Sequence, residues 1–290
     1  MTAIPQVKIG VLGGTGLYDM EGLSNVRELT LTTPYGNPSD TITIGELDGI
    51  EVAFLPRHGR GHRLLPAEIP ARANIHALKQ LGVERIVSVS AVGSLREEIE
   101  PLHMVVPDQL IDRTKGRAST FFGDGLVAHV AFGDPFCPEL GLLLAEAANN
   151  TEATVHHGGT YLVMEGPAFS TKAESKLYQS WGASVIGMTA IPEAKLAREA
   201  EICYAVLATA TDYDAWHEVH EQVTVEIVLA NLTQNVYTSQ QALRKLLPRL
   251  QNIRHCGCGS ALGHALVTSM DLIPRTTIDR LGPLVSKYIS

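Results

Sequence analysis

The sequence has no excess of positive charge. Its 290 residues contain 23 Lys and Arg against 31 Asp and Glu, a formal net charge of −8. Because phosphate polymers and anionic lipid surfaces attract basic faces, we expect neither nucleic acid nor a membrane as a partner. The chain also lacks an apolar run of about 18 residues, which a membrane span requires, and its first residues do not resemble a signal peptide. We therefore expect a cytoplasmic protein.

Cysteine is scarce. The four cysteines are Cys137, Cys203, Cys256 and Cys258, too few and too unevenly spaced for the disulfide framework of a secreted protein. Cys203 lies in an apolar run and is expected in the core. Cys256 and Cys258, with His255 and His264 nearby, are compatible with zinc ligands, a small disulfide or a pair of exposed thiols. A strong zinc motif needs a second pair, so we predict no metal site.

Several catalytic and cofactor motifs are missing. Gly14 and Gly16 are followed by Asp19 where a dinucleotide-binding turn has its third glycine, and no P-loop lysine is present. No serine lies in a G-x-S-x-G motif, and residues 217–220 are one residue short of H-E-x-x-H. These absences argue against a nucleotide cofactor, a serine hydrolase and a zinc protease. We predict an activity without a cofactor.

The pattern that is present alternates strands with helices. Expected strands cover residues 8–12, 52–55, 85–89, 104–106, 159–164, 184–188 and 202–208, and residues 32–55 are expected to form a strand, a turn and a hairpin. Expected helices cover residues 70–81, 138–149, 171–181, 192–200 and 223–247. This alternation predicts one α/β domain over residues 1–250. Residues 251–290 are expected to be a tail with short helices packed on the same domain.

Three segments that follow strands suit an anion. Residues 13–17, Gly-Gly-Thr-Gly-Leu, form a turn whose backbone N–H groups can point at a phosphate. Five of the residues from 57 to 63 are Arg or His, and arginine forks bind oxyanions. Ser90 and Ala91 follow a third strand. A glycine turn without a ligand and a solvated basic loop remain alternatives.

Two carboxylates end the apolar run 202–208. Asp212 and Asp214 are two residues apart and share a face of an extended chain. Burial and mutual repulsion raise carboxyl pKa values, so one acid of such a pair can stay protonated beside an acceptor. This combination matches N7 and the 6-amino group of adenine. The alternative is an Asp-Tyr-Asp turn that caps a helix.

Seven segments together resemble a known family. They are residues 13–17, residues 57–60, Ala91 with residues 93–99, residues 134–138, residues 165–170, Met188-Thr189 and residues 210–214. In this order they resemble the nucleoside phosphorylase family of the trimeric type, most closely its members that act on 5'-methylthioadenosine. The resemblance covers residues 8 to about 250. It implies a twisted, partly closed mixed central sheet flanked by helices, a homotrimer, and phosphorolysis of 5'-methylthioadenosine in purine and methionine salvage.

The resemblance also implies roles for single residues. Phosphate would be bound by Thr15, Arg57, His58, Ser90, Ala91 and Thr189. The nucleoside would be bound by Phe169, Ser170, Met188, Thr211, Asp212, Asp214, Val225, Val228 and His129, the last from a neighbouring subunit. Asp212 would donate to purine N7 and Asp214 would accept from the 6-amino group. Relatives that act on 6-oxopurines carry Glu and Asn instead, so the two aspartates favour adenine.

Two alternatives to this activity stay open. One is a phosphorylase for adenosine or a 6-oxopurine nucleoside such as 5'-methylthioinosine, and the other is a non-catalytic module that binds adenine nucleosides. Both phosphorylase interpretations require Arg57 and the two aspartates at opposite ends of one cavity, whereas a binding module gains nothing from a separate phosphate pocket. We therefore expect these side chains on the same side of the fold.

Overall fold

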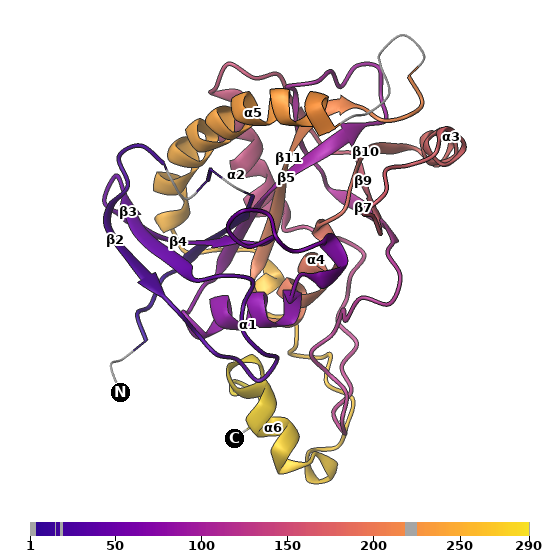
Figure 1. The fold of residues 1–290 in the computed structure, drawn as a ribbon. Helices are drawn as coiled ribbons and strands as arrows, with labels where there is room; N and C mark the ends of the chain where they lie inside the picture. The colour runs from indigo at the N-terminus through magenta and orange to yellow at the C-terminus, as the bar shows by residue number, and fades with distance from the viewer. Residues whose placement is uncertain (1–3, 15, 18–19, 218–224, 290) are drawn as a thin grey trace.

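A computed structural model describes residues 4–14, 16–17, 20–217 and 225–289 as a mixed sheet flanked by helices (Figure 1). The strands are β1 (Ile9–Gly13), β2 (Ser24–Leu29), β3 (Ile42–Leu47), β4 (Ile50–Pro56), β5 (Arg85–Ser94), β6 (Met104–Val106), β7 (Gln109–Arg113), β8 (Val155–His157), β9 (Thr160–Met164), β10 (Ala183–Gly187) and β11 (Cys203–Tyr213). The α-helices are α1 (Ala71–Gln80), α2 (Pro138–Asn149), α3 (Lys172–Ser180), α4 (Ala190–Glu199), α5 (Val225–Leu246) and α6 (Arg275–Leu281). No helix among these residues is long and apolar enough to cross a membrane.

The sheet is organised around β5. This strand pairs in parallel with β1 on one side and with β11 on the other, and its last residues also pair antiparallel with β10. The main path runs β2-β3-β4-β1-β5-β10-β9-β7, and β11, β6 and β8 form a branch. Because β1, β4, β5 and β11 run in parallel, their carboxyl ends lie at the same edge, where α/β proteins bind ligands.

Helices cover both faces of this sheet. Buried residues of α1 and α4 share one hydrophobic cluster with β3 and part of β11. Residues of α2 and α5 join a second cluster on the opposite face (Figure 1). All eleven residues of β11 are buried, because a strand between two helical layers is apolar on both faces.

The predicted α/β domain with a mixed central sheet is confirmed, but its partial closure is not. Within the described residues, β2, β7 and β8 each pair with a single neighbour, so the sheet has open ends. The expected strand near residue 32 is also wrong. Thr33 and Gly36 form a short turn, and the strand lies earlier, at β2.

The helix boundaries agree closely with the sequence. Thr171 and Glu174 form the expected capping box at the start of α3, with the Glu174 N–H donating to the Thr171 hydroxyl at 3.1 Å. The expected helix 138–149 is α2 and the expected helix 223–247 corresponds to α5. Two short strands, β7 and β8, carried no recognisable pattern.

The C-terminal segment, residues 251–289, contains α6 and three short 3-10 turns, η3 (Gly257–Ser260), η4 (Met270–Leu272) and η5 (Gly282–Leu284). Two further turns are η1 (Pro66–Glu68) and η2 (Leu247–Gln251). Leu262, Leu281 and Val285 are buried in the same cluster as α1 and α4. The segment therefore contributes to the main core.

Candidate functional site

Arg57 lies directly after β4, at the edge where the parallel strands end. Its backbone N–H donates to the Gly13 carbonyl oxygen at 3.0 Å, which joins it to the glycine turn after β1. Its guanidinium donates to the Val89 carbonyl oxygen of β5 at 2.7 Å. Arg57 therefore contacts both the glycine turn and β5, so the three segments predicted to bind an anion lie side by side.

The charge of Arg57 is neutralised inside the protein. The side chain is 2% exposed and forms a two-pronged pair with Glu193, with Nε–Oε1 at 2.7 Å and Nη2–Oε2 at 3.2 Å. Nη2 also donates to the Ser88 hydroxyl at 2.6 Å and lies 3.1 Å from the Leu12 carbonyl oxygen. Of the five N–H groups, one on Nη1 has no acceptor in the described part of the chain. Arg57 can thus offer one directed hydrogen bond to an anion.

The remainder of the basic loop is likewise not a free cationic surface. Burial lowers the pKa of His58 to about 4, so the imidazole is neutral at pH 7. Its Nδ1 lies 2.9 Å from the Leu64 carbonyl oxygen, which leaves Nε2 as an acceptor. Arg60 pairs with Glu28 and Arg63 pairs with Asp40. Carboxylates therefore compensate the charge of the three arginines in this loop, and His58 is neutral.

A chain of hydroxyl groups lies beside Arg57. The Ser90 hydroxyl on β5 is 2.8 Å from the Thr189 hydroxyl and 3.0 Å from the Tyr161 hydroxyl. Thr189 directly precedes α4, whose backbone is not helical at Ile191, so Thr189 can contact an anion through its hydroxyl group. Ala91, next on β5, is exposed, so a ligand can approach the backbone there. Neutral donors thus surround one place at the strand ends.

Asp212 is positioned by a β-bulge. The pairing of β11 with β5 shifts between Ala210 and Asp212, so Thr211 is the extra residue, and such bulges redirect the side chains that follow. The Thr211 hydroxyl donates to Asp212 Oδ2 at 2.6 Å. Burial, opposed by this hydrogen bond and reinforced by Asp214, raises the pKa of Asp212 to about 6. The carboxyl group can therefore hold a proton near neutral pH.

Asp214 supplies an unpaired acceptor beside it. Its backbone N–H donates to the Ser94 carbonyl oxygen at 2.9 Å, while its side-chain Oδ2 is buried without a hydrogen-bond partner in the described structure. Burial raises the pKa of this carboxyl group too, and the hydroxyl groups of Ser175 and Ser170 partly offset the rise. Asp212 and Tyr213 belong to β11, so the turn begins only after them, at Asp214.

Gly93 keeps the space between the two aspartates open. A Cβ atom at this position would lie 3.2 Å from Asp212 Oδ1 and 3.3 Å from Asp214 Cβ. Arg57 contacts the carbonyl oxygen of Val89, four residues earlier on the same strand. At about 3.3 Å per residue the two ends are roughly 13 Å apart along β5. The guanidinium and the aspartates therefore both lie against β5.

The loop after β9 lies against Met188. Gly166 has φ +70, and a Cβ atom there would be 2.5 Å from Met188 Sδ. The buried Ser170 hydroxyl is 3.7 Å from Met164 Sδ, whereas Phe169 is 45% exposed. Phe169 is therefore an unusually exposed aromatic side chain for this part of the fold.

Four predicted site residues are not tested by this geometry. Thr15 lies outside the described residues. Val225 and Val228 lie in the first turn of α5, where the structure describes the backbone but not these side chains. The His129 N–H donates to the Ala265 carbonyl oxygen, and its segment is extended without being one of the strands. Among the described residues, no hydrogen bond or ion pair joins His129 to the aspartates or to Arg57.

Several supporting residues escaped the sequence analysis. Glu193 pairs with Arg57 and accepts a hydrogen bond from the buried Tyr204 hydroxyl at 2.8 Å. Arg117 donates to the carbonyl oxygens of Met188 at 2.7 Å and Ile191 at 2.8 Å, and also pairs with Glu165. The sequence does hold a signal for Glu193: it is a single acidic residue in an otherwise apolar segment, residues 190–194. Arg117 had no such signal, because it lies in a polar loop.

Comparison with known proteins places this geometry among related chains. Residues 8–248 match the phosphorylase superfamily. The chain is 58% identical to S-methyl-5'-thioadenosine phosphorylase of Geobacter sulfurreducens, covering 97% of this chain and 99% of the relative. It is 56% identical to the enzyme of that name from Synechocystis sp., covering 97% and 87%.

Solved structures agree with these sequences. A methylthioadenosine phosphorylase from an antarctic soil metagenomic library superposes with a TM-score of 0.91 at 50% identity, covering 96% of this chain and 99% of the other. Methylthioadenosine phosphorylase from Schistosoma mansoni, solved in complex with adenine, superposes with a TM-score of 0.83 at 34% identity, covering 89% and 96%. The similarity extends over nearly the whole chain in both cases.

Proposed function

Because the chain belongs to the phosphorylase superfamily, we propose that it cleaves 5'-methylthioadenosine with inorganic phosphate to give adenine and 5-methylthioribose 1-phosphate. The family acts on nucleosides with phosphate, and relatives that are 58% and 56% identical to this chain carry the name of this activity. The observation that carries the proposal is the placement of the oxyanion donors and the carboxyl pair on one strand, β5 with its neighbour β11.

The reaction needs opposite groups at the two ends of the sugar. Phosphorolysis of an N-glycosidic bond develops positive charge on the ribose and negative charge on the departing base. A phosphate held under the sugar stabilises the first, and a proton donor at the base stabilises the second. We assign the base donor to Asp212, which would deliver its proton to purine N7.

Asp214 would select the 6-amino group. Its buried Oδ2 lacks a hydrogen-bond partner in the described structure, and an exocyclic N–H would satisfy it. A 6-oxo base would instead place a second acceptor against this oxygen. The geometry therefore supports a preference for adenine over hypoxanthine. Ser170 and Thr211, which lie next to the two carboxyl groups, would complete the base site.

We assign the phosphate site to the hydrogen-bond donors at the other end. Arg57 contributes its single free N–H, Ser90 and Thr189 contribute hydroxyl groups, and Ala91 contributes backbone. His58, as a neutral imidazole with Nδ1 engaged, can accept a hydrogen bond at Nε2 from the P–OH group of hydrogen phosphate. Thr15 is kept as a further candidate on the strength of the family resemblance.

The sugar and its 5' substituent would contact apolar side chains. Met188 is half-buried against Gly166, and Phe169 is exposed, so both are available to pack on the purine and ribose. We place the methylthio group against Val225 and Val228, one turn apart on α5. These assignments rest on the family resemblance together with the position of α5 beside β11.

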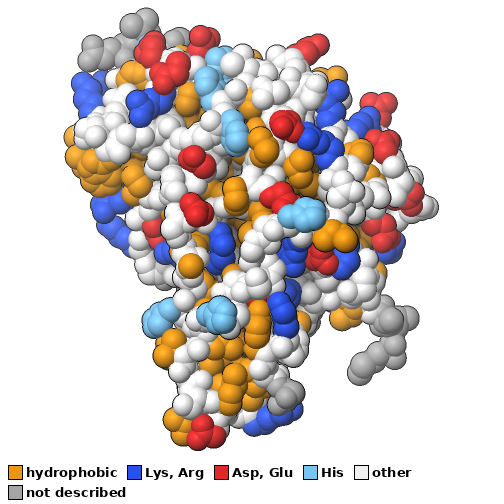
Figure 2. Space-filling model, turned by 180° about the vertical axis from the view of Figure 1, so that it is seen from behind, with side chains coloured by type: hydrophobic (Ala, Val, Ile, Leu, Met, Phe, Trp, Pro, Cys, Tyr) orange, Lys and Arg blue, Asp and Glu red, His pale blue; other side chains and the backbone are white. Residues whose placement is uncertain are grey.

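We propose a homotrimer in which His129 reaches a neighbouring site. His129 lies in an extended segment paired with the C-terminal segment, and four exposed apolar side chains flank this pairing: Val127, Val267, Met270 and Leu272. Figure 2 shows hydrophobic side chains gathered on the lower part of the molecule, where this segment lies. Exposed apolar patches of this kind mark interfaces. If so, Val267→Asp should dissociate the assembly in sedimentation experiments and lower activity, and a monomer of unchanged specific activity would contradict the proposal.

We place the protein in the cytoplasm. Its four cysteines are unpaired with one another as disulfides, which is typical of a reducing compartment.

The decisive experiment measures adenine release from 5'-methylthioadenosine with and without phosphate. The proposal expects adenine and a sugar phosphate in equal amounts, and no release without phosphate. Release without phosphate would indicate a hydrolase, and binding without any product under saturating phosphate would indicate a binding module. Faster turnover of 5'-methylthioinosine than of 5'-methylthioadenosine would overturn the role assigned to Asp214.

A further inference from the structure

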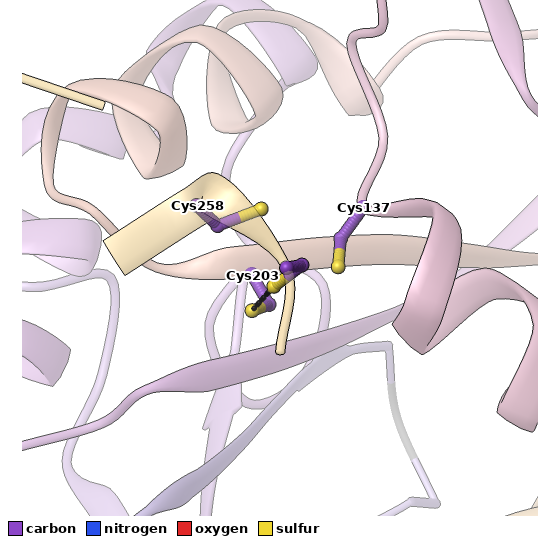
Figure 3. Close-up of side chains that lie close together, drawn as sticks. Cys137, Cys203 and Cys258 are labelled. Atoms are coloured by element: carbon purple, nitrogen blue, oxygen red, sulfur yellow. Dashed lines mark hydrogen bonds between the residues drawn. The ribbon is translucent and has the colours of Figure 1, made fainter. Parts of the chain in front are cut away.

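All four cysteines of the chain meet at one place, although they come from distant parts of the sequence. Cys137 is the N-cap residue of α2, Cys203 begins β11, and Cys256 and Cys258 lie in the C-terminal segment around η3. Their four sulfur atoms all lie within 4.8 Å of one another. Figure 3 shows the side chains of Cys137, Cys203 and Cys258 pointing toward a common centre.

The spacing fits a tetrahedral ion. Zn–S bonds of about 2.3 Å in a tetrahedron place the sulfur atoms roughly 3.8 Å apart. The sulfur atoms of Cys203 and Cys256 are 3.3 Å apart, and all four cysteines are free thiols. We propose that Cys137, Cys203, Cys256 and Cys258 bind a structural Zn²⁺ ion. A set of four thiolates without an open position suits a structural site, since a catalytic zinc keeps one position for water.

The surroundings support thiolate ligands. Arg254 brings its Nη1 to 3.8 Å from Cys203 Sγ, while the same nitrogen is tied to the carbonyl oxygens of Glu84 and Glu201. The Leu140 N–H points at Cys137 Sγ at 3.4 Å. Four thiolates around Zn²⁺ carry a net charge of −2, and N–H donors and a guanidinium in the second shell offset that charge. The environment is thus suited to metal-bound sulfur.

This site differs from what the sequence indicated. The Cys256 and Cys258 pair alone was a weak motif, and exposed thiols were an alternative, yet Cys258 is 4% exposed. The missing second pair is Cys137 with Cys203, which lie 119 and 53 residues before Cys256 and are brought to it by the fold. The prediction of no metal site considered only neighbours in sequence.

The ion would fasten the C-terminal segment to the sheet. Cys203 begins the strand whose other end carries Asp212, nine residues and roughly 30 Å away, so the metal would not touch the proposed reaction. It would join η3 to α2 and β11 at the amino end of that strand. Loss of the ion should therefore affect stability more than turnover.

Elemental analysis of the full-length protein, purified under reducing conditions, tests the proposal. We expect about one zinc per chain, released when a mercurial reagent modifies the thiols, with the melting temperature falling by several degrees afterwards. Cys256→Ser and Cys258→Ser should each lose most of the zinc. His255→Ala and His264→Ala, which alter the neighbouring histidines, are the matched controls and should retain it.

A second measurement needs no variant. Replacement of zinc by Co²⁺ in the wild-type protein should give the intense sulfur-to-cobalt absorption of a tetrahedral thiolate site. Metal-free protein with the cysteines joined in disulfides, zinc content unchanged in both serine variants, or cobalt bound without that absorption would each overturn the proposal. Phosphate-dependent turnover measured on the same samples keeps this outcome separate from the proposed reaction.

Discussion

At the scale of single residues, burial raises the pKa of both aspartates. Asp212 can therefore donate a proton, while Asp214 offers a hydrogen-bond acceptor. Asp212 has a pKa raised to about 6, mainly by burial, and Asp214 is also raised. A protonated carboxyl group beside an open carboxylate oxygen is unusual at neutral pH. This pair is the part of the site most sensitive to small chemical changes.

Asp212→Asn should lower kcat by about 10² to 10⁴ while changing the KM for the nucleoside little, because an amide can still donate a hydrogen bond to N7 but cannot transfer a proton. Steady-state release of adenine measures both constants. Asp271→Asn, an exposed acid of η4, is the matched control and should behave as wild type. A kcat within a few-fold of wild type would remove Asp212 from the proton transfer.

The same substitution should stabilise the fold at neutral pH. The pKa of Asp212 rises from 3.8 unfolded to about 6 folded, so the folded state binds protons more tightly and loses stability as the pH rises from about 4 through 6. Asn carries no such penalty. We expect Asp212→Asn to gain at most about 3 kcal/mol at pH 8 and almost nothing at pH 4. Thermal unfolding at the two pH values measures this, and an equal effect at both would contradict it.

Glu193 should matter through Arg57. Glu193→Gln leaves a buried guanidinium without its counter-charge, and breaking a buried pair typically costs about 3 to 5 kcal/mol. Urea unfolding should show this loss, together with a higher KM for phosphate because the guanidinium loses its orientation. Asp279→Asn breaks the exposed pair with Arg275 and should change little. A stable Glu193→Gln protein with normal phosphate affinity would refute the coupling.

At the scale of secondary-structure elements, α5 holds the bulge that aims Asp212. The Asn235 side chain donates to the Ala210 carbonyl oxygen at 3.0 Å, and Asn231 donates to the Thr211 carbonyl oxygen at 2.6 Å. The Ala210 carbonyl oxygen also accepts a hydrogen bond from the Leu102 N–H at 2.8 Å. The two asparagines, one turn apart on α5, therefore tie the helix to the backbone at the bulge.

Asn235→Ala should therefore reduce kcat more than it raises KM, because Asp212 would lose its fixed orientation. The Ala210 carbonyl oxygen keeps its hydrogen bond from the Leu102 N–H, so the fold should lose only the worth of one hydrogen bond, about 0.5 to 1.5 kcal/mol. Kinetics and urea unfolding report the two effects. Thr233→Ala on the exposed side of the same helix is the control. Equal behaviour of the two variants would show that α5 does not position the aspartate.

Elements with strong periodicity were predictable from the sequence, and elements without it were not. The apolar runs of β5 and β11 identify buried parallel strands, and the capping box of α3 marks its start. β2 was missed because nearly all of its residues are exposed, so no alternation appears. β8 is three residues long, too short for a pattern.

Some features of the candidate site were likewise predictable from the sequence and others were not. Arg57, Asp212 and Asp214 follow strands and carry chemistry that a sequence displays. The sequence did not reveal that Arg57 forms an ion pair, because its partner Glu193 lies 136 residues away and only the fold brings the two together. Long-range partners of this kind determine charge and pKa, which sequence patterns leave open.

At the scale of the whole molecule, residues 251–289 belong to the core that supports the site. Leu284 and Leu281 are buried with α1 and α4, and Glu201 on the main domain accepts a hydrogen bond from the Leu262 N–H at 3.0 Å. We therefore propose that the segment is part of one folding unit with the matched family region, which ends at residue 248.

Truncation after residue 250 should yield a chain that aggregates or unfolds without a sharp transition, because the cluster around α1 and α4 becomes exposed. Size-exclusion chromatography and calorimetry test this. Leu284→Ala should destabilise the intact chain by about 2 to 5 kcal/mol, whereas Ile253→Ala, at an 82% exposed position, should not. A monodisperse truncated chain with the melting temperature of the full protein would show that the segment is an appendage.

The attachment of the proposed phosphate site and the proposed base site to β5 has a consequence for the substrates that we expect. The length of one hydrogen-bonded strand sets the separation of the two proposed sites, so no movement of a loop or domain is needed to establish it. The distance between the two proposed sites is therefore fixed by the sheet. We expect that a nucleoside analogue with one extra methylene between the base and the anomeric carbon would bind through its base. It would not be cleaved, because the attacking phosphate oxygen could not reach the anomeric carbon.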